Sequence, residues 1–166
     1  MKLELNHLAA YLPFGLKIMY FGKQRKMNAG NGSSTHWIGI TATLQRQGEN
    51  CKPILRPLSD LTKEIEVGGE RFVPIVELAK IAGFKIAKKY KTGIEGEFCF
   101  VDINKEHYGI QDRFSYFTET KVFRTVLNGY GCFNQLQLFQ KLFEWHFDVF
   151  GLIEQGLAID INTLNK

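Results

Sequence analysis

Two prolines four residues apart, Pro53 and Pro57, impose the strongest local constraint on this chain. Proline fixes its own φ, lacks a backbone donor and pushes the preceding residue toward an extended backbone. The residues between them are therefore predicted to be stiff and extended. A short helix is predicted to begin at Leu58, with Ser59 as its cap and Asp60 at the positive end of the helix dipole.

Short apolar segments separated by glycine precede the prolines. Residues 14–21, 37–44 and 51–55 are rich in aromatic and β-branched side chains, which favour strands. Residues 22–26 are predicted to form the turn after the first segment. Several short strands joined by turns indicate a small curled antiparallel sheet or partial barrel.

Strands and one helix are predicted after the prolines. Gly68 and Gly69 lie between residues 65–67 and 71–73 and predict a two-residue hairpin turn. Pro74 suits the first position of a helix that ends at Gly83. One stripe of apolar side chains has helical spacing: Ile75, Leu78, Ala79 and Ala82. Residues 98–103 and 121–127 are predicted strands.

A long C-terminal helix is predicted over residues 133–150. Its apolar face has helical spacing and consists of Phe139, Leu142, Phe143, His146 and Phe150. The predicted fold class is α+β, with the N-terminal sheet packed against a few helices. The 166 residues are predicted to form a single domain, β-rich over 1–58, mixed α/β over 59–132 and helical over 133–166.

The number of cysteines and the length of the apolar runs indicate the cellular compartment in which the protein is expected. The chain has three cysteines, Cys51, Cys99 and Cys132, an odd number spaced too widely for a disulfide framework or a Cys-x-x-Cys metal site. No apolar run approaches the roughly 18 residues that cross a bilayer. The N-terminus makes a poor signal peptide. We therefore expect a reduced, cytoplasmic protein that does not associate with membranes.

Local signatures of catalysis do not stand out. The glycines near residue 30 lack the spacing of a phosphate-binding loop, and the four histidines lie far apart in the sequence. His146 is flanked by Glu144 and Asp148, but residues two apart on a helix point in different directions. His146 is interpreted as a hydrogen-bonded core residue, and Cys99 as a buried thiol. No catalytic residue, metal ligand or cofactor is assigned; a small hydrolase or metal enzyme is a remote alternative.

Basic residues suggest a nucleic-acid surface. Residues 75–84 resemble the first helix and turn of a helix-turn-helix, which would place a second helix over residues 85–91. The candidate binding residues are Lys85, Lys88, Lys89, Tyr90 and Lys91, with Lys17, Lys23, Arg25 and Lys26 from the N-terminal region. The alternatives are looser nucleic-acid contact and a solvated basic face.

The net charge of +4 is unevenly distributed along the chain. Residues 1–58 carry eight basic and two acidic side chains, a net charge of +6. Residues 59–96 carry +1, and residues 97–166 carry −3. A polyanion is therefore expected to bind near the N-terminal strands and the lysines of residues 85–91.

Three stretches together resemble a known group of sequences. They read HLAAYLPFGLK at residues 7–17, KPILRPLSDL at residues 52–61 and FDVFGLIEQGLAID at residues 147–160. Their order and spacing resemble a family of uncharacterised small proteins encoded by bacteriophages and prophages of gut bacteria. The resemblance implies a mobile-element origin and the cytoplasm of a bacterial host cell. It implies no activity, cofactor or catalytic residue.

The aromatic content, 13% of residues, predicts a phenylalanine-rich core, with an exposed aromatic docking surface as the alternative. The leading functional hypothesis is a non-enzymatic binding protein that contacts an unidentified protein partner. The alternative hypothesis is a nucleic-acid-binding accessory protein that uses the basic residues above.

Overall fold

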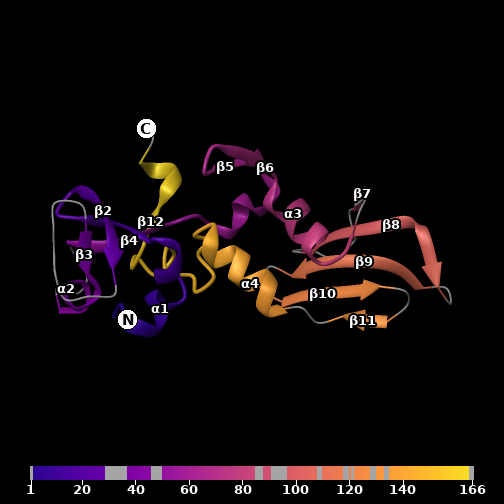
Figure 1. Ribbon diagram of the computed structural model, residues 1–166, viewed down its shortest axis with the longest axis horizontal. Helices are drawn as coiled ribbons and strands as arrows, with labels where there is room; N and C mark the ends of the chain where they lie inside the picture. The colour runs from indigo at the N-terminus through magenta and orange to yellow at the C-terminus, as the bar shows by residue number, and fades with distance from the viewer. Residues whose placement is uncertain are drawn as a thin grey trace. The chain divides into compact units, whose positions relative to one another are not determined.

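The computed structural model describes residues 2–28, 37–45, 50–84, 88–90, 97–107, 110–117, 120, 122–127, 130–132 and 135–164. The fold is α+β, as predicted (Figure 1). The chain divides into two compact units. The terminal unit comprises Met1–Leu58 with Leu142–Lys166, and the central unit comprises Ser59–Lys141. The single-domain expectation stays a prediction, and each unit is described by itself.

A five-stranded sheet organises the terminal unit, with strand order β12-β4-β1-β2-β3. Its strands are β1 (Lys17–Tyr20), β2 (Lys23–Asn28), β3 (Trp37–Gly39), β4 (Cys51–Leu55) and β12 (Ile159–Asp160). The short helices are α1 (Leu5–Ala9), η1 (Leu12–Phe14), α2 (Ile40–Gln45) and η3 (Ile161–Thr163). β1 is antiparallel to β2 and β4, while β2 pairs with β3, and β4 with β12, in parallel. The sheet is therefore mixed rather than purely antiparallel.

Two N-terminal predictions are wrong in detail. The turn after β1 contains only Phe21 and Gly22, and Lys23 to Lys26 belong to β2 instead of the predicted turn. The segment predicted as a strand over 37–44 leaves the sheet after Gly39 and becomes α2. Burial explains the second difference, because Ile40 and Thr43 are three residues apart and both are buried. Tertiary packing overrides the strand preference of β-branched residues here.

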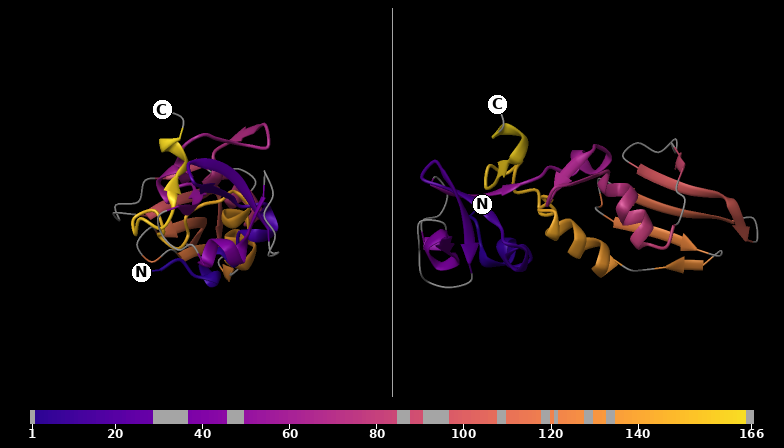
Figure 2. Two further views of the ribbon diagram at one scale, coloured as in Figure 1. Left: turned by 90° about the vertical axis from the view of Figure 1, so that its left-hand side faces the viewer. Right: turned by 45° about the horizontal axis from the view of Figure 1, so that its top comes forward.

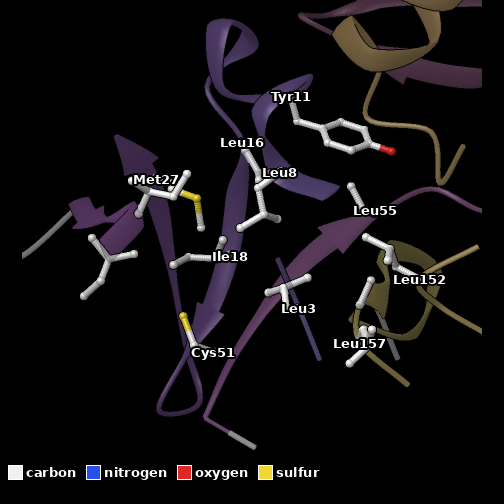
Figure 3. Close-up of a cluster of buried hydrophobic side chains, with 13 residues drawn as sticks. Leu3, Leu8, Tyr11, Leu16, Ile18, Met27, Cys51, Leu55, Leu152 and Leu157 are labelled. Atoms are coloured by element: carbon white, nitrogen blue, oxygen red, sulfur yellow. The ribbon is translucent and has the colours of Figure 1, made fainter. Parts of the chain in front are cut away.

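The core of the terminal unit combines side chains from both ends of the chain (Figure 3). It contains Leu3, Leu8, Tyr11, Leu16, Ile18, Met27, Ile38, Ile40, Cys51, Leu55, Leu152, Leu157 and Ala158. The last three members follow the central unit in sequence. The N-terminal sheet therefore completes its core only with residues from the C-terminal end.

Backbone pairing fixes this junction of the two chain segments. The Arg56 N–H donates to the His146 carbonyl at 2.8 Å, and the Asp148 N–H donates to the Arg56 carbonyl at 2.7 Å. The Tyr11 hydroxyl donates to the Phe147 carbonyl at 2.8 Å and accepts from the Val149 N–H at 3.3 Å. The extended backbone predicted around Pro53 and Pro57 thus provides the pairing edge for residues 146–148.

A second five-stranded sheet, of order β11-β10-β9-β8-β7, forms most of the central unit (Figure 2). All four of its strand pairs are antiparallel. Its strands are β7 (Lys88–Tyr90), β8 (Glu97–His107), β9 (Ile110–Phe117), β10 (Val122–Leu127) and β11 (Tyr130–Cys132). The remaining elements are η2 (Leu58–Thr62), β5 (Ile65–Val67), β6 (Glu70–Phe72), α3 (Pro74–Ile81) and α4 (Gln135–Glu144).

Several predictions for the central unit are confirmed. β5 and β6 form the expected hairpin, with both turn glycines at positive φ. α3 starts at Pro74, and its predicted apolar stripe is buried. The expected aromatic core is present, since Phe114 stacks on Phe123 at 5.7 Å and Phe139 meets Phe123 edge-on at 5.4 Å.

The predicted long C-terminal helix is wrong beyond Glu144, where α4 ends. The His146 N–H donates to the Phe143 carbonyl, and the Phe147 N–H donates to the Leu142 carbonyl at 2.8 Å. His146 itself has a left-handed backbone, with φ of 57°. This is a Schellman cap, and it usually has glycine at the left-handed position. The cap directs Phe147 into its pairing with Arg56.

No helix among the described residues combines the length and the apolar character that crossing a membrane requires.

Replacing Tyr11 by phenylalanine is expected to lower the free energy of unfolding by about 0.5–1.5 kcal/mol, because the buried Phe147 carbonyl loses one of its two hydrogen bonds and keeps the one from the Val149 N–H. Urea denaturation followed by circular dichroism measures this difference. Unchanged stability would show that the Tyr11 hydroxyl does not hold the junction together.

Candidate functional site

Three neighbouring strands of the terminal unit, β4, β1 and β2, contain cations and no carboxylates. The cations are Lys17, Lys23, Arg25, Lys26 and Lys52. Because these strands contain cations and no carboxylates, they create a positive electrostatic potential that attracts a polyanion over long range.

The strand register places three of these lysines on one face of the sheet. Lys17 lies directly opposite Lys26, and Met19 lies opposite Lys52. Side chains alternate along a strand, and Ile18 belongs to the core, so Lys17 and Met19 point away from it. We call Lys17, Lys26 and Lys52 the lysine face; the first two are exposed and Lys52 is half-buried.

The pairing of Lys17 with Lys26 is electrostatically unfavourable. Residues directly opposite in an antiparallel pair have their Cβ atoms about 5 Å apart, and like charges there destabilise the sheet. An anion bound to the lysine face would relieve this repulsion. The arrangement therefore favours an anionic ligand over a neutral one.

The other two cations lie on the opposite face. Arg25 pairs with Ile18, and its guanidinium lies over the Tyr20 ring at 5.6 Å from the ring centre. Lys23 is exposed beside the turn and pairs with Tyr20. The structure thus separates Lys26 from Lys23 and Arg25, although the three were predicted as one group.

Of the alternatives for the basic residues, the helix-turn-helix is wrong. Lys88, Lys89 and Tyr90 form strand β7, paired antiparallel with β8, where a recognition helix was expected. The hydrogen bonds of this sheet extend the backbone and leave no helix to enter a groove. Lys85 and Lys91 lie outside the described residues.

The turn between β1 and β2 contains an unexpected residue. Phe21 has φ of 46° and Gly22 has φ of 72°, the pattern of a type I′ hairpin turn. Such turns strongly favour Asn, Asp or Gly at the first position, because a bulky side chain is strained at positive φ. Phe21 nevertheless occupies it, and its side chain is 54% exposed.

Neighbouring groups hold Phe21 in place. Its N–H donates to the Asn50 carbonyl at 2.9 Å, which ties the turn to the start of β4. Its ring meets the Tyr20 ring edge-on, with 4.7 Å between the centres and 86° between the planes. Because Arg25 covers Tyr20, the two aromatic rings and the guanidinium form one connected series. The exposed ring is therefore positioned before any ligand arrives.

A hollow of about 270 Å³ adjoins the turn. It is lined by Met19, Phe21, Gly22, Asn50, Lys52 and Ile159. Met19 and Lys52 place it on the side of the sheet that bears the lysine face. A hollow with both apolar and polar lining residues, an aromatic ring and three lysines thus lie together on one side of one sheet.

Lys17 and Lys26 were identified in the sequence from their charge, but Phe21, Asn50 and the hollow were not identified. The Phe21-Gly22 pair is a signal for this turn, because it lies between two segments whose side chains alternate as they do in strands. A phenylalanine where hairpins use asparagine marks a position that is not optimised for folding alone.

A second cluster of titratable groups lies at the junction in the terminal unit. The two Asp148 carboxylate oxygens accept from the Leu152 and Ile153 N–H groups, each at 2.8 Å. The Tyr11 hydroxyl is engaged with backbone on both sides, and burial raises its pKa. These groups satisfy buried backbone, which is a structural role.

His146 belongs to the same cluster. Burial lowers its pKa to about 4, and the charges of Lys17 and Arg56 add to this effect, while a hydrogen bond with the Phe14 backbone opposes it. The hydrogen bond agrees in part with the interpretation of His146 as a hydrogen-bonded core residue, although its buried Nε2 atom has no hydrogen-bond partner within the part of the chain that the structure describes. Among the described residues, no three His, Cys, Asp or Glu side chains gather in a way that could hold a metal ion.

Comparison with known proteins finds no matching family model, no matching curated protein and no matching solved structure. The function is therefore inferred from the geometry of the site.

The pKa of His146 predicts that stability falls in mild acid. The unfolded state takes up a proton near pH 6.5 and the folded state only near pH 4, so acidification between these values favours unfolding. The loss approaches about 3 kcal/mol at pH 4. Urea denaturation at pH 7, 6, 5 and 4 measures it, with His146→Asn as a control because Asn tolerates positive φ. An equally steep pH dependence in His146→Asn would contradict the assignment.

The strain at Phe21 predicts a difference between two variants. Phe21→Asn and Phe21→Leu both remove the ring contact with Tyr20, but only asparagine suits the left-handed backbone. Phe21→Asn is expected to be more stable than Phe21→Leu by about 1 kcal/mol in urea denaturation. Equal stability of the two variants would show that the turn is not strained.

Proposed function

We propose that this protein is a non-enzymatic binding protein whose ligand is single-stranded nucleic acid. The observation that supports it is the lysine face beside a positioned, exposed Phe21. Proteins that bind single strands combine cations that follow the phosphate backbone with aromatic rings on which bases stack. Both elements are present on one sheet of the terminal unit.

The charges of the site support a polyanion. β1, β2 and β4 themselves contain no carboxylate that would repel phosphate. Lys17 and Lys26 lie directly opposite each other, so a phosphate bound there would be attracted by both charges.

The exposed ring favours a single strand over a duplex. The bases of a duplex are already stacked on each other, and a side chain reaches their flat faces only by unstacking them. Bases of a single strand present their faces at little cost. Phe21, at the end of a hairpin, is accessible to such a base.

The titratable cluster of the junction supports binding rather than catalysis. Tyr11 and Asp148 are hydrogen-bonded to backbone groups, and displacing Asp148 would remove the acceptors of the Leu152 and Ile153 N–H groups. A catalytic role for these groups would compete with the fold of the terminal unit.

A protein partner is the second candidate. Exposed aromatic residues commonly anchor protein interfaces, and Phe21 is one of the exposed large apolar side chains. The lysine face would require such a partner to be acidic. The setting proposed for either partner is the cytoplasm of a phage-infected bacterium, as the sequence resemblance implies.

Salt dependence tests the nucleic-acid proposal. For a labelled single strand of about ten nucleotides, the affinity is expected to fall with a slope of about −2 in log K against log salt if all three lysines contact phosphate. This corresponds to a loss of roughly 20-fold between 50 and 200 mM salt. Lys26→Gln is expected to reduce the slope by about 0.7. Fluorescence anisotropy measures both quantities.

The matched control is Lys80→Gln, which removes a cation from the central unit, where Lys80 is paired with Glu77 at 2.6 Å. It is expected to leave the slope unchanged. Absence of binding, or an equal slope in Lys26→Gln, would overturn the proposal. Binding of polyglutamate with the affinity of the oligonucleotide would instead favour an acidic protein partner.

A further inference from the structure

The hollow beside Phe21 has walls of two kinds. Met19, Phe21 and Ile159 are apolar lining residues, while Asn50 and Lys52 are lining residues with polar side chains. An amide both donates and accepts hydrogen bonds, and an ammonium group donates to anions. A ligand that fits must therefore be flat or apolar in one part and carry a negative charge in another.

The size of the hollow limits this ligand further. Its volume of about 270 Å³ lies just below the range of pockets for drug-sized molecules. It suits one small ring system and is too small for a helix or a folded loop of a partner. Gly22 contributes no side chain, and a Cβ placed there would meet no atom within 4 Å, so this wall is open toward solvent.

We propose that the hollow receives one unpaired nucleobase, with the phosphate of the same nucleotide at Lys52. The inference rests on the proposed function and deepens it. The base would stack against Phe21 and contact the Met19 thioether, which interacts favourably with aromatic rings. The Asn50 amide is suited to the hydrogen-bonding edge of the base.

The rigid surroundings of Phe21 fit this role. Tyr20 and the Asn50 carbonyl hold the ring before binding, so stacking requires little loss of side-chain freedom. A phenylalanine at positive φ is a cost to folding that a base-stacking role would explain.

A comparison of two oligonucleotides tests the inference. One is a single strand of about ten adenine nucleotides, within the site sizes of such proteins. The other has the same length and charge but lacks all of its bases. The wild-type protein is expected to bind the base-containing strand roughly 5- to 150-fold more tightly at equal salt, as one stacked base requires. In Phe21→Asn this discrimination is expected to disappear while the salt slope stays unchanged.

Gly68→Asn is the matched control, because it alters the equivalent hairpin turn of the central unit at a positive φ that asparagine tolerates. It is expected to retain full discrimination. A wild-type protein that binds both strands equally and with a steep salt slope would overturn the base pocket and leave the proposed function standing. Failure of both strands to bind would overturn the proposed function itself. Discrimination that persists in Phe21→Asn would also overturn the pocket.

Adenosine monophosphate distinguishes the two sources of such a nucleotide. Saturable binding that Phe21→Asn abolishes would support the pocket and identify a free nucleotide as sufficient. Base discrimination between the strands without binding of the monophosphate would support the pocket and show that the nucleotide must be part of a strand.

Discussion

The terminal unit depends on hydrogen bonds between segments that are far apart in the sequence. Arg56 extends β4 by pairing with residues 146–148, and the Tyr11 hydroxyl satisfies the carbonyl of Phe147 and the N–H of Val149. Buried backbone groups must be paired, so these contacts determine where the returning chain can lie. β12 then adds to β4, and β4 in turn supports β1 and the lysine face. The position of the candidate site therefore depends on the hydrogen bonds of the junction, although the junction residues are not part of the site.

Two hairpins of the chain differ in how well their turn residues suit a backbone with positive φ. The β5–β6 hairpin turns on Gly68 and Gly69, which adopt positive φ without strain. The β1–β2 hairpin makes a turn of the same kind with Phe21 in the first position. A sequence under selection for folding alone would have asparagine or glycine there. The departure coincides with the exposed ring, the hollow and the lysines.

The sequence predicted the structure correctly where the conformational preferences of single residues determine it. Proline at the start of α3 and glycine at its left-handed cap mark that helix, and the cap is the same motif as the one that ends α4. At α4 the left-handed residue is His146, so no glycine marked the end, and the helix was predicted to continue to residue 150. The site was found only in part: Lys17 and Lys26 were identified from charge, whereas their pairing and the hollow depend on strand register and on distant Ile159.

Because the terminal unit consists of two separate segments of the chain, it can complete its fold only after the central unit has been synthesised. Residues after Leu142 complete its core, so its first 58 residues must wait while the ribosome makes the central unit, which lies wholly within one continuous stretch. At bacterial and eukaryotic elongation rates that wait lasts roughly 4 to 17 seconds. During it, β1, β2 and β4 have apolar faces without their final cover. A nascent chain that stalls in the central unit would therefore expose these strands to chaperones and proteases, whereas the completed chain covers them.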